Sequence, residues 1–411
     1  SNINKNLSDK TNQYFNILGI SAKNKTKKRI FNIKDYNWVD NPLDLINLPN
    51  CDILIELIGE EKGISYDLIK KALEKNIHVV TANKALLSIN GKKLFDIADK
   101  NKTQLLFEAA VGGGIPIIKI LKQSIFLNKI YKISGILNGT TNFILSEMEN
   151  KNLSFELILK DAQKNGYAES NPTNDIEGID SAHKLSLLST LCFGSKIDFD
   201  NISCNGISKI DIDDIRNANK LGYKIKLISE SEVINNKITS VVEPKLIKKG
   251  SHLANINGVL NAVKIESDHL NPLILEGEGA GGKATASSII SDIYEIFLKN
   301  SSPSLGVPVN YLKSYDNLDL SSQSSSFYLR IIAKDITGVL AKITSHLNDQ
   351  GISIETILQI PDKNVSNNEI PIIIVTHMTT KKLLSKALNK IEKLDFVLNQ
   401  ITVITIDNHL D

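Results

Sequence analysis

Apolar residues between Ile179 and Phe193 are spaced as on a helix that is buried on most sides. The run IDSAHKLSLLSTLCF has leucines on nearly every side of a helical wheel, so we predict a helix with little contact to water. It also contains Asp180 and Lys184, which stand four residues apart and therefore share one face. Burying such charges costs on the order of several kcal/mol each unless they are paired or used. The helix is therefore the first candidate functional site.

Further acidic residues precede this helix. Glu169, Asp175 and Glu177 add carboxylates, and Tyr167 adds a phenol. Acids that face a buried lysine suit a small zwitterionic substrate and a proton transfer at an alcohol or carbonyl. The alternative is an exposed ion pair, worth only ~0.3–0.5 kcal/mol on an ordinary surface helix.

From Phe15 onward, short apolar runs alternate with stretches of helical periodicity. The runs FNILGIS, CDILIELIG, IHVVTA and QLLFEAA are predicted strands, and helices are predicted near 63–76, 85–100 and 115–127. This alternation is typical of a doubly wound parallel sheet in an α/β domain. Ligands of such sheets bind at the carboxyl ends of the strands, so Gly59, the segment Thr81 to Lys84 and the turn Val111 to Gly114 should line one crevice.

The middle of the chain mixes strands and helices. The stretch KIYKISGILNGTTNFILSEM predicts a strand and then a helix that starts near Asn138 to Asn142, where exposed amides and hydroxyls can hold carboxylate or amide groups. An ordinary capped helix explains the same residues. Further helices are predicted near 154–165 and 211–221, and strands in YKIKLIS, KITSVVEP, LNAVKIES and PLILEG. We therefore predict an α+β domain.

The tail has a βαββαβ pattern. Residues 300–325 are rich in Pro, Gly and Ser, which predicts a linker with a domain boundary near 320–325. Beyond it, FYLRIIAKD, ISIETILQI, IPIIIVTHM and FVLNQITVITI are predicted strands, and the two stretches ITGVLAKITSHLNDQG and KKLLSKALNKIEKL are predicted helices. This order is that of a ferredoxin-like domain.

Composition narrows the class of protein. The chain has 411 residues, 42% of them apolar, and a net charge of +2, which allows two to three globular domains and gives no indication of nucleic-acid binding. It has no apolar run of the ~18–20 residues that span a bilayer, and its first residues are polar, so we expect a cytoplasmic protein without a membrane partner. Cys51, Cys192 and Cys204 are scattered without CxxC spacing, so neither a disulfide framework nor a zinc site is predicted.

Four motifs together resemble the homoserine dehydrogenase family: TANKALL from Thr81, NGTTN from Asn138, GYAE at Gly166 to Glu169, and DxxGxDSAxKL from Asp175. In the last of these, Ser181 stands where the family usually has Ala. The resemblance covers 15–407 and implies NAD(P)-linked interconversion of L-homoserine and L-aspartate 4-semialdehyde in amino-acid biosynthesis. It also implies the following roles: catalytic, Lys184, Lys84 and Asp180; substrate-binding, Glu169, Tyr167, Asp175 and Thr140; cofactor-binding, Gly59, Thr81, Asn83, Lys84, Lys23, Arg29 and Gly279. On sequence alone, Lys84 is as readily a solvated loop residue, and His183 is a core or rim residue.

The resemblance also bears on the cofactor. No GxGxxG fingerprint occurs, and FNILGIS matches the family's second strand, so we expect the first strand of the Rossmann-like sheet, the fingerprint and most of the first helix to be missing. Basic residues from Lys23 to Arg29 favour NADP over NAD, although a solvated basic loop explains them too. The loop Glu276 to Gly282 touches the cofactor in the family. Glu278 stands where Pro is common, so a tight packing turn is the alternative for Gly279.

A cation and an effector are further implied. In the family, a carboxylate and carbonyl groups on the FEAAVGGGIP turn bind a monovalent cation, Na⁺ or K⁺, and the matching residues are Glu108, Val111, Gly113 and Ile115. A simple reversing turn is the alternative. The tail resembles the ACT domain, which binds amino acids, and Asp335 to Leu340 would receive an effector, threonine by resemblance.

We therefore expect a nucleotide-binding domain at 1–130 completed by 276–300, a catalytic domain at 131–300, a linker at 301–325 and an ACT domain at 326–411, in a homodimer or homotetramer. One alternative is a truncated, weakly active chain that works mainly as an amino-acid-binding module. Another is a thiol-dependent semialdehyde dehydrogenase, which needs an activated cysteine near a histidine.

Overall fold

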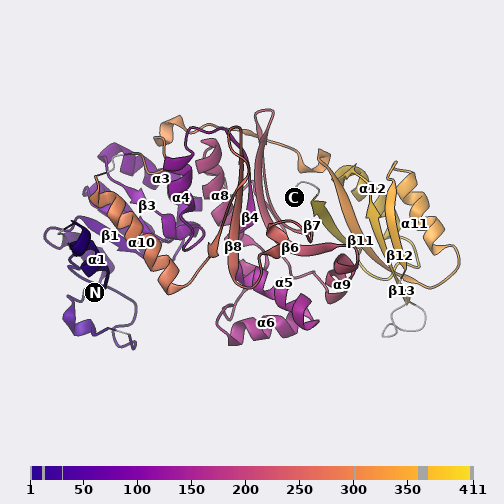
Figure 1. The fold of residues 1–411 in the computed structure, drawn as a ribbon, viewed down its shortest axis with the longest axis horizontal. Helices are drawn as coiled ribbons and strands as arrows, with labels where there is room; N and C mark the ends of the chain where they lie inside the picture. The colour runs from indigo at the N-terminus through magenta and orange to yellow at the C-terminus, as the bar shows by residue number, and fades with distance from the viewer. Residues whose placement is uncertain (1, 12–13, 30, 300–301, 360–368, 408–411) are drawn as a thin grey trace.

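The computed structural model describes residues 2–11, 14–29, 31–299, 302–359 and 369–407. The molecule is elongated (Figure 1), with a small parallel sheet at one end, a large sheet in the middle and the βαββαβ tail at the other end. None of the helices in these ranges is long and apolar enough to cross a membrane.

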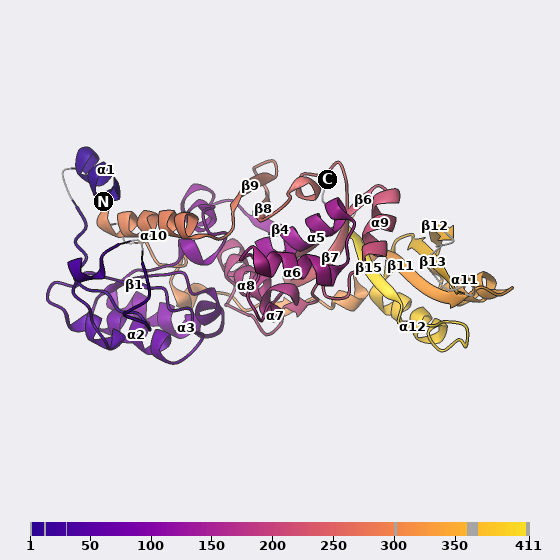
Figure 2. The same ribbon diagram turned by 90° about the horizontal axis from the view of Figure 1, so that it is seen from below.

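The small sheet is parallel, has three strands in the order β1-β2-β3, and is covered on both faces (Figure 2). Helices α2 and α3 lie on one face, and α10 lies on the other, where Ile289 and Ile293 pack against Val80 and Leu106. The elements are α1 (Asn2–Thr11), β1 (Ile53–Glu56), α2 (Ile64–Glu74), β2 (His78–Thr81), α3 (Lys84–Asn101), β3 (Leu105–Leu106) and α10 (Gly282–Phe297). The doubly wound arrangement is confirmed, and a helix from much later in the chain completes it.

Three local predictions in this part are wrong. FNILGIS is not a strand among the described residues, because its only ladder contact is a bridge between Ile20 and Trp38. The run QLLFEAA is a strand only at β3, since the Glu108 amide donates to Asp292 Oδ2 (2.8 Å) instead of to a neighbouring strand. The helix predicted near 115–127 is a short α4 (Ile117–Lys119) followed by a π-helical turn at Ile120–Ser124.

The central sheet carries the helices that hold the candidate site. Its strands are β4 (Ile130–Ile136), β5 (Ser203–Cys204), β6 (Tyr223–Ile234), β7 (Lys237–Lys248), β8 (Leu260–Ser267), β9 (Leu273–Glu278) and β10 (Asp316–Asn317). Its helices are α5 (Gly139–Lys151), α6 (Phe155–Lys164), α7 (Thr173–Ile176), α8 (Ile179–Phe193) and α9 (Ile212–Lys220). Helix α8 packs against β4, β6 and β7, and Leu185, Leu187 and Leu188 lie in the main hydrophobic core. The prediction of a buried helix is confirmed.

The tail has the predicted βαββαβ order. Its elements are β11 (Ser324–Lys334), α11 (Val339–Asn348), β12 (Ile354–Gln359), β13 (Glu369–Thr376), β14 (Thr379–Thr380), α12 (Lys381–Ile391) and β15 (Thr402–Asp407). The last strand, β15, also pairs in parallel with β7, through Thr405 to Asp407 against Lys245 to Ile247. The tail sheet and the central sheet are therefore one continuous sheet, which the sequence did not predict.

Candidate active site

Two lysines and an amide converge on the carboxylate of Asp180, at the first turn of α8. Lys184 Nζ lies 2.7 Å from Asp180 Oδ2, and Lys84 Nζ lies 3.1 Å from Oδ1. Asn138 Nδ2 also donates to Oδ2, at 2.9 Å. Lys184 Nζ donates further to the carbonyl oxygen of Leu137, at 2.6 Å. A single carboxylate therefore orients both lysines.

The starts of helices α3, α5 and α8 bring Lys84, Asn138 and Asp180 together. Helix α3 begins with Lys84 directly after β2, and the side chain of Asn83 caps it by accepting from Leu86 N (3.1 Å). Asn138 follows β4 and caps α5 by accepting from Thr141 N (2.8 Å). Because its side-chain oxygen caps the helix, the Asn138 amide nitrogen is directed at the carboxylates.

The two lysines have different electrostatic environments. Attraction to Asp180 raises the pKa of Lys84, whose side chain is 36% exposed. The pKa of Lys184 is lowered, because burial of its side chain, which is only 8% exposed, and the nearby Lys84 charge outweigh the attraction of Asp180. Burial alone would raise the pKa of Asp180, but the two lysines hold it well below its ordinary value. Lys184 is therefore the lysine that gives up its proton more readily.

The predicted substrate-binding residues surround this centre. Asp175 accepts from Asn138 Nδ2 at 2.7 Å, and burial raises its pKa. Thr140 Oγ1 donates to the carbonyl of Tyr167 at 2.6 Å, which ties the first turn of α5 to the loop that carries the exposed Glu169. The negative charge of Glu169 contributes to the raised pKa of Lys84.

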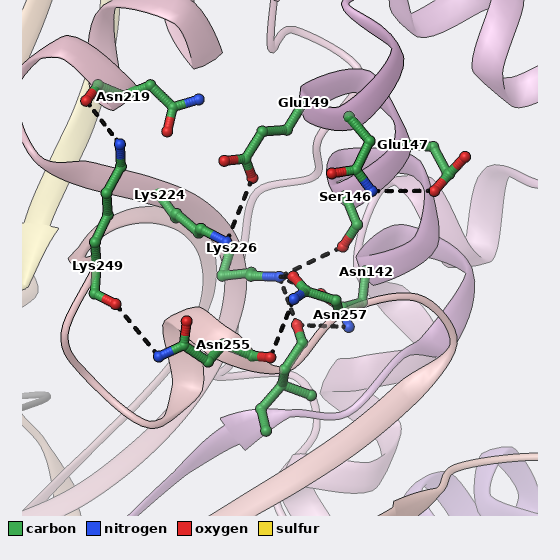
Figure 3. Close-up of polar contacts among 12 residues, drawn as sticks. Asn142, Ser146, Glu147, Glu149, Asn219, Lys224, Lys226, Lys249, Asn255 and Asn257 are labelled. Carbon is green, nitrogen blue, oxygen red and sulfur yellow. Dashed lines mark hydrogen bonds and ion pairs between the residues drawn. The ribbon is translucent and has the colours of Figure 1, made fainter.

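Lys226, a buried lysine that the sequence did not indicate, contacts the first turn of α5 through Asn142 (Figure 3). Lys226 Nζ donates to Asn142 Oδ1 (2.9 Å) and to the carbonyl of Ile256 (2.5 Å), while Asn142 Nδ2 donates to the carbonyls of Ile256 and Leu260. Burial lowers the pKa of Lys226 to about 7. Its contacts join strand, helix and loop across long stretches of sequence, so no local pattern could have revealed it.

A cavity of about 440 Å³ lies at the carboxyl ends of β1 and β2 and the start of α10. Gly59 and Asn83 line it, together with Gly282 and Thr285. Thr81 does not line it but is buried behind, where its hydroxyl donates to Glu56 Oε2 at 2.6 Å. The other Glu56 oxygen accepts from the amides of Ile58 and Gly59, at 2.7 and 3.3 Å. Glu56, which sequence reasoning missed, therefore shapes the Gly59 turn.

Gly279 has a packing role in the structure. The amide of Gly114 donates to the carbonyl of Glu278 at 2.9 Å. A Cβ on Gly113 would lie 2.5 Å from the Gly279 backbone, and one on Gly279 would lie 2.1 Å from the side chain of Asn261. Gly113 therefore needs to lack a side chain for the two turns to meet, and Gly279 needs to lack one to fit against Asn261.

The predicted cation residues lie on a buried turn. Glu108 is 1% exposed, and its two oxygens accept from the amides of Ile118 and Lys119, at 2.8 and 3.0 Å. Burial, with the nearby Asp292 charge, raises its pKa to about 7. The carbonyls of Gly113 and Ile115 accept from Ser288 Oγ and Ile117 N. In the described ranges, no three or more His, Cys, Asp or Glu residues gather as a metal site.

The basic segment folds back on itself. Lys23 is exposed, and the Arg29 guanidinium donates to the carbonyls of Asn24, Lys25 and Lys27. It also lies 5.6 Å from the centre of the Trp38 ring. Arg29 therefore organises the loop, while Lys23 is open to solvent.

The cysteines do not provide an activated thiol. Burial raises the pKa of Cys204 to about 11 and raises the pKa values of Cys51 and Cys192 as well. A thiolate nucleophile needs a lowered pKa. The structure therefore disfavours the thiol-dependent alternative.

A second cavity, of about 540 Å³, lies in the tail. It is lined by Asp335, Gly338 and Leu340 from the turn before α11, by Lys334 from β11 and by Gln359 from β12. The turn predicted to receive an effector therefore opens onto a cavity.

Comparisons with known proteins agree with this geometry. Family models described as "Homoserine dehydrogenase, NAD binding domain", "Homoserine dehydrogenase" and "ACT domain" match residues 1–108, 116–294 and 327–396. The chain is 39% identical to the homoserine dehydrogenase of Neisseria gonorrhoeae over 377 residues, which are 90% of this chain and 86% of that protein. A match of this extent does not favour the alternative of a chain that works mainly as an amino-acid-binding module.

Solved structures give the same result. The crystal structure of a homoserine dehydrogenase from Thiobacillus denitrificans has a TM-score of 0.84 and 39% identity, over 91% of this chain and 86% of that chain. A hyperthermophilic archaeal homoserine dehydrogenase in complex with NADPH has a TM-score of 0.56 and 28% identity, over 64% of this chain and 76% of that chain. The chain therefore belongs to the homoserine dehydrogenase family and is an oxidoreductase with a nicotinamide-nucleotide-binding domain, a catalytic domain and an ACT domain.

Proposed function

We propose that Asp180, Lys184 and Lys84 form the centre at which this chain interconverts L-homoserine and L-aspartate 4-semialdehyde. The observation that carries the proposal is the placement of both lysines within 3.1 Å of the Asp180 carboxylate. The nicotinamide cofactor, when bound, supplies the hydride acceptor in the direction of alcohol oxidation. The protein must then remove the hydroxyl proton of homoserine.

Lys184 is the proposed base for that proton. A general base must be deprotonated near the working pH, and the pKa of Lys184 is lowered on balance, because burial and Lys84 outweigh the attraction of Asp180. Lys84 keeps its proton because Asp180 raises its pKa, so its positive charge can stabilise negative charge that develops on the substrate oxygen. Asp180 orients both ammonium groups.

The remaining site residues are proposed to hold the two ends of the amino acid. Asp175 and Glu169 provide negative charge for the substrate ammonium group. Thr140 and the first amides of α5 suit its carboxylate, because helix N-termini attract anions. Tyr167 packs against Phe143, with ring centres 4.8 Å apart, and is proposed to close this side of the site.

The Lys84→Met variant tests the division of roles. Because the Lys84 charge lowers the pKa of Lys184, its removal should raise that pKa. The rise of kcat for homoserine oxidation should therefore shift to higher pH, measured as a pH profile at saturating substrates. Lys92→Met, an exposed lysine on the same helix, should leave the profile unchanged, and a shift to lower pH in Lys84→Met would contradict the assignment.

NADP is the proposed cofactor in preference to NAD. The cavity between Gly59, Asn83 and the start of α10 fits a nucleotide at the ends of parallel strands, and a relative was solved in complex with NADPH. Lys23 and its basic neighbours would face the 2′-phosphate. Gly279 is proposed to support this region through its contact with the Gly113 turn.

We expect a higher kcat/KM for NADP than for NAD, and this preference should weaken as salt is added, since exposed charges are screened over ~10 Å at 0.1 M. Lys23→Ala should lower the NADP to NAD ratio by up to ~5-fold, the range of one exposed ion pair. Lys93→Ala removes a comparably exposed lysine on α3 and should not change it. Steady-state kinetics with both cofactors at two salt concentrations measure this, and a salt-independent or reversed preference would refute the proposal.

A monovalent cation is proposed at the Glu108 turn. Glu108, Asp292 and Glu295 are three buried carboxylates near two lysines. Lys119 Nζ lies 3.3 Å from Asp292, and Lys122 Nζ lies 3.6 Å from Glu295, so the carboxylates outnumber the lysines. The carbonyls of Val111, Gly113 and Ile115 are hard oxygen ligands of the kind that alkali cations accept, and a carbonyl that accepts one hydrogen bond retains a second lone pair. The residues present therefore fit Na⁺ or K⁺.

Cation binding should raise the melting temperature. At roughly 100 times its dissociation constant, a ligand specific for the folded state adds about 2.7 kcal/mol of stability. Tm should therefore be higher in NaCl or KCl than in tetramethylammonium chloride at equal ionic strength. Glu108→Gln should abolish the difference, whereas Glu60→Gln, at an exposed carboxylate, should preserve it. Equal Tm values in the three salts would rule the site out.

The remaining proposals concern regulation and assembly. Threonine is proposed as the effector in the tail cavity, where Asp335 offers a carboxylate for an ammonium group and the amides that open α11 suit a carboxylate. The proposed domains are a nucleotide-binding domain at 1–130 completed by 276–300, a catalytic domain at 131–300, a linker at 301–325 and an ACT domain at 326–411. A homodimer or homotetramer is proposed from the family.

A further inference from the structure

Two polar contacts, one helical turn apart, join α3 to α8. The first is the ion pair between Lys84 and Asp180. The second is a hydrogen bond of 2.6 Å between Ser88 Oγ and His183 Nδ1. Ser88 follows Lys84 by four residues and His183 follows Asp180 by three, so each pair lies on one helix face. His183 is therefore in contact with the helix of Lys84 while it neighbours Lys184 in sequence.

The contacts of Ser88 and Phe199 constrain the side chain of the histidine. Ser88 Oγ also lies 2.9 Å from the carbonyl of Ala85, to which it donates its single proton. When the hydroxyl donates its proton to that carbonyl, it accepts from His183 Nδ1–H, and this is the arrangement we assign. Burial lowers the pKa of His183; the charges of Glu61 and Asp180 raise it and that of Lys84 lowers it again. Phe199 stacks on the ring, with centres 4.2 Å apart and planes at 11°. The ring is therefore held in one plane, with Nδ1 directed at Ser88 Oγ.

The two helices belong to different halves of the active site. Helix α3 follows Asn83, which lines the proposed cofactor cavity, whereas α8 carries Asp180 and Lys184. A relative shift of these helices would change the separation of the two lysines and the approach of substrate to cofactor. Misplacement by ~1 Å can lower a rate by ~10²-fold.

We propose that His183 is a positioning residue, whose Nδ1–H bond to Ser88 locks α3 against α8 and so sets the spacing of Lys84 and Lys184 around Asp180. This inference rests on the roles proposed above for the two lysines. It assigns no proton transfer to His183 and does not require it to touch the substrate.

The experiment compares four variants of the full chain. His183→Asn keeps a side-chain N–H near the position of Nδ1, His183→Leu has the same branched shape without a donor, and Ser88→Ala removes the acceptor. His183→Leu and Ser88→Ala should each lower kcat by roughly tenfold, with smaller changes in the KM for homoserine. His183→Asn should recover most of kcat. The double variant His183→Leu/Ser88→Ala should be no slower than the slower single variant, because both remove the same bond.

Several outcomes would overturn the proposal. These are additive losses of kcat in the double variant, equal kcat values for His183→Asn and His183→Leu, or a fall in Tm without a fall in kcat. Lys184→Met, measured in the same series, separates a failure of the positioning role of His183 from a failure of the proposed function. If it is inactive while the His183 and Ser88 variants are unimpaired, only the positioning role fails; if it retains full kcat, the catalytic assignment fails instead.

Discussion

Replacing Lys184 by methionine is expected to lower kcat by ~10²–10⁴-fold, the usual contribution of a general acid or base. Methionine has a similar length and no charge, so it can fill the same buried space. Asp180 would keep Lys84 and Asn138 as partners, at 3.1 and 2.9 Å, and would not be left as an unpaired buried charge. The fold should therefore survive, and steady-state kinetics together with a melting curve measure both effects.

The matched control is Lys100→Met. Lys100 is also part of an i,i+4 pair with an aspartate, Asp96, but its side chain is 70% exposed and lies at the far end of α3. It should retain full kcat. If Lys184→Met remains nearly as active as the control, then Lys84 or another group carries the proton.

The sequence predicted the parts of this site that rest on local spacing. The buried helix and the ion pair between Asp180 and Lys184 follow from one helical period. The approach of Lys84 to Asp180 was expected only through family resemblance, because it joins two elements that are far apart in sequence. For the same reason, neither Lys226 beneath Asn142 nor Glu56 behind the Gly59 turn could be predicted.

In the fold, too, local patterns were predictable and contacts between distant elements were not. Most of the order of strands and helices was predictable from alternating apolar runs, but the parallel pairing of β15 with β7 was not. An apolar strand can pair with the edge of any compatible strand, and its own sequence pattern does not indicate which strand that is. FNILGIS illustrates the converse, because a β-like pattern forms a strand only where a neighbouring strand lies beside it.

The continuous sheet gives the tail a direct connection to the catalytic region. Arg330 on β11 donates from Nε to Asp214 Oδ1 (2.6 Å) and from Nη2 to Oδ2 (2.9 Å). Asp214 is fully buried in the first turn of α9, and α9 contacts α5, the helix that Asn138 caps. Arg330 lies four residues before Lys334, which lines the tail cavity. The pair therefore ties β11, the strand that ends at the proposed effector cavity, to α9, which in turn contacts α5.

Arg330→Met is expected to destabilise the protein by ~3–5 kcal/mol, the usual cost of removing one partner of a buried pair. It would leave the buried Asp214 charge to two neutral donors, Tyr328 Oη and the Asp211 amide. Arg216→Met is the matched control, since Arg216 and Asp213 form an ion pair on the surface of the same helix, with side chains 42% and 41% exposed. That pair is worth at most ~1 kcal/mol, so the Tm of Arg216→Met should differ little from that of the unsubstituted protein. Adding Asp214→Asn to Arg330→Met removes the stranded charge and should restore part of the lost stability.

If threonine, the proposed effector, inhibits the enzyme from the tail cavity, the double variant should also separate its binding from its inhibition. Coupling between sites is usually ~1–3 kcal/mol and requires contacts that differ between states. In Arg330→Met/Asp214→Asn, calorimetry should still detect threonine at the tail cavity, while its effect on kcat or on the KM for homoserine should be reduced at least fivefold. Arg216→Met should be inhibited normally. Full inhibition of the double variant would show that the coupling passes elsewhere, and inhibition that is strictly competitive with homoserine, with no binding at the tail, would place threonine in the substrate site itself.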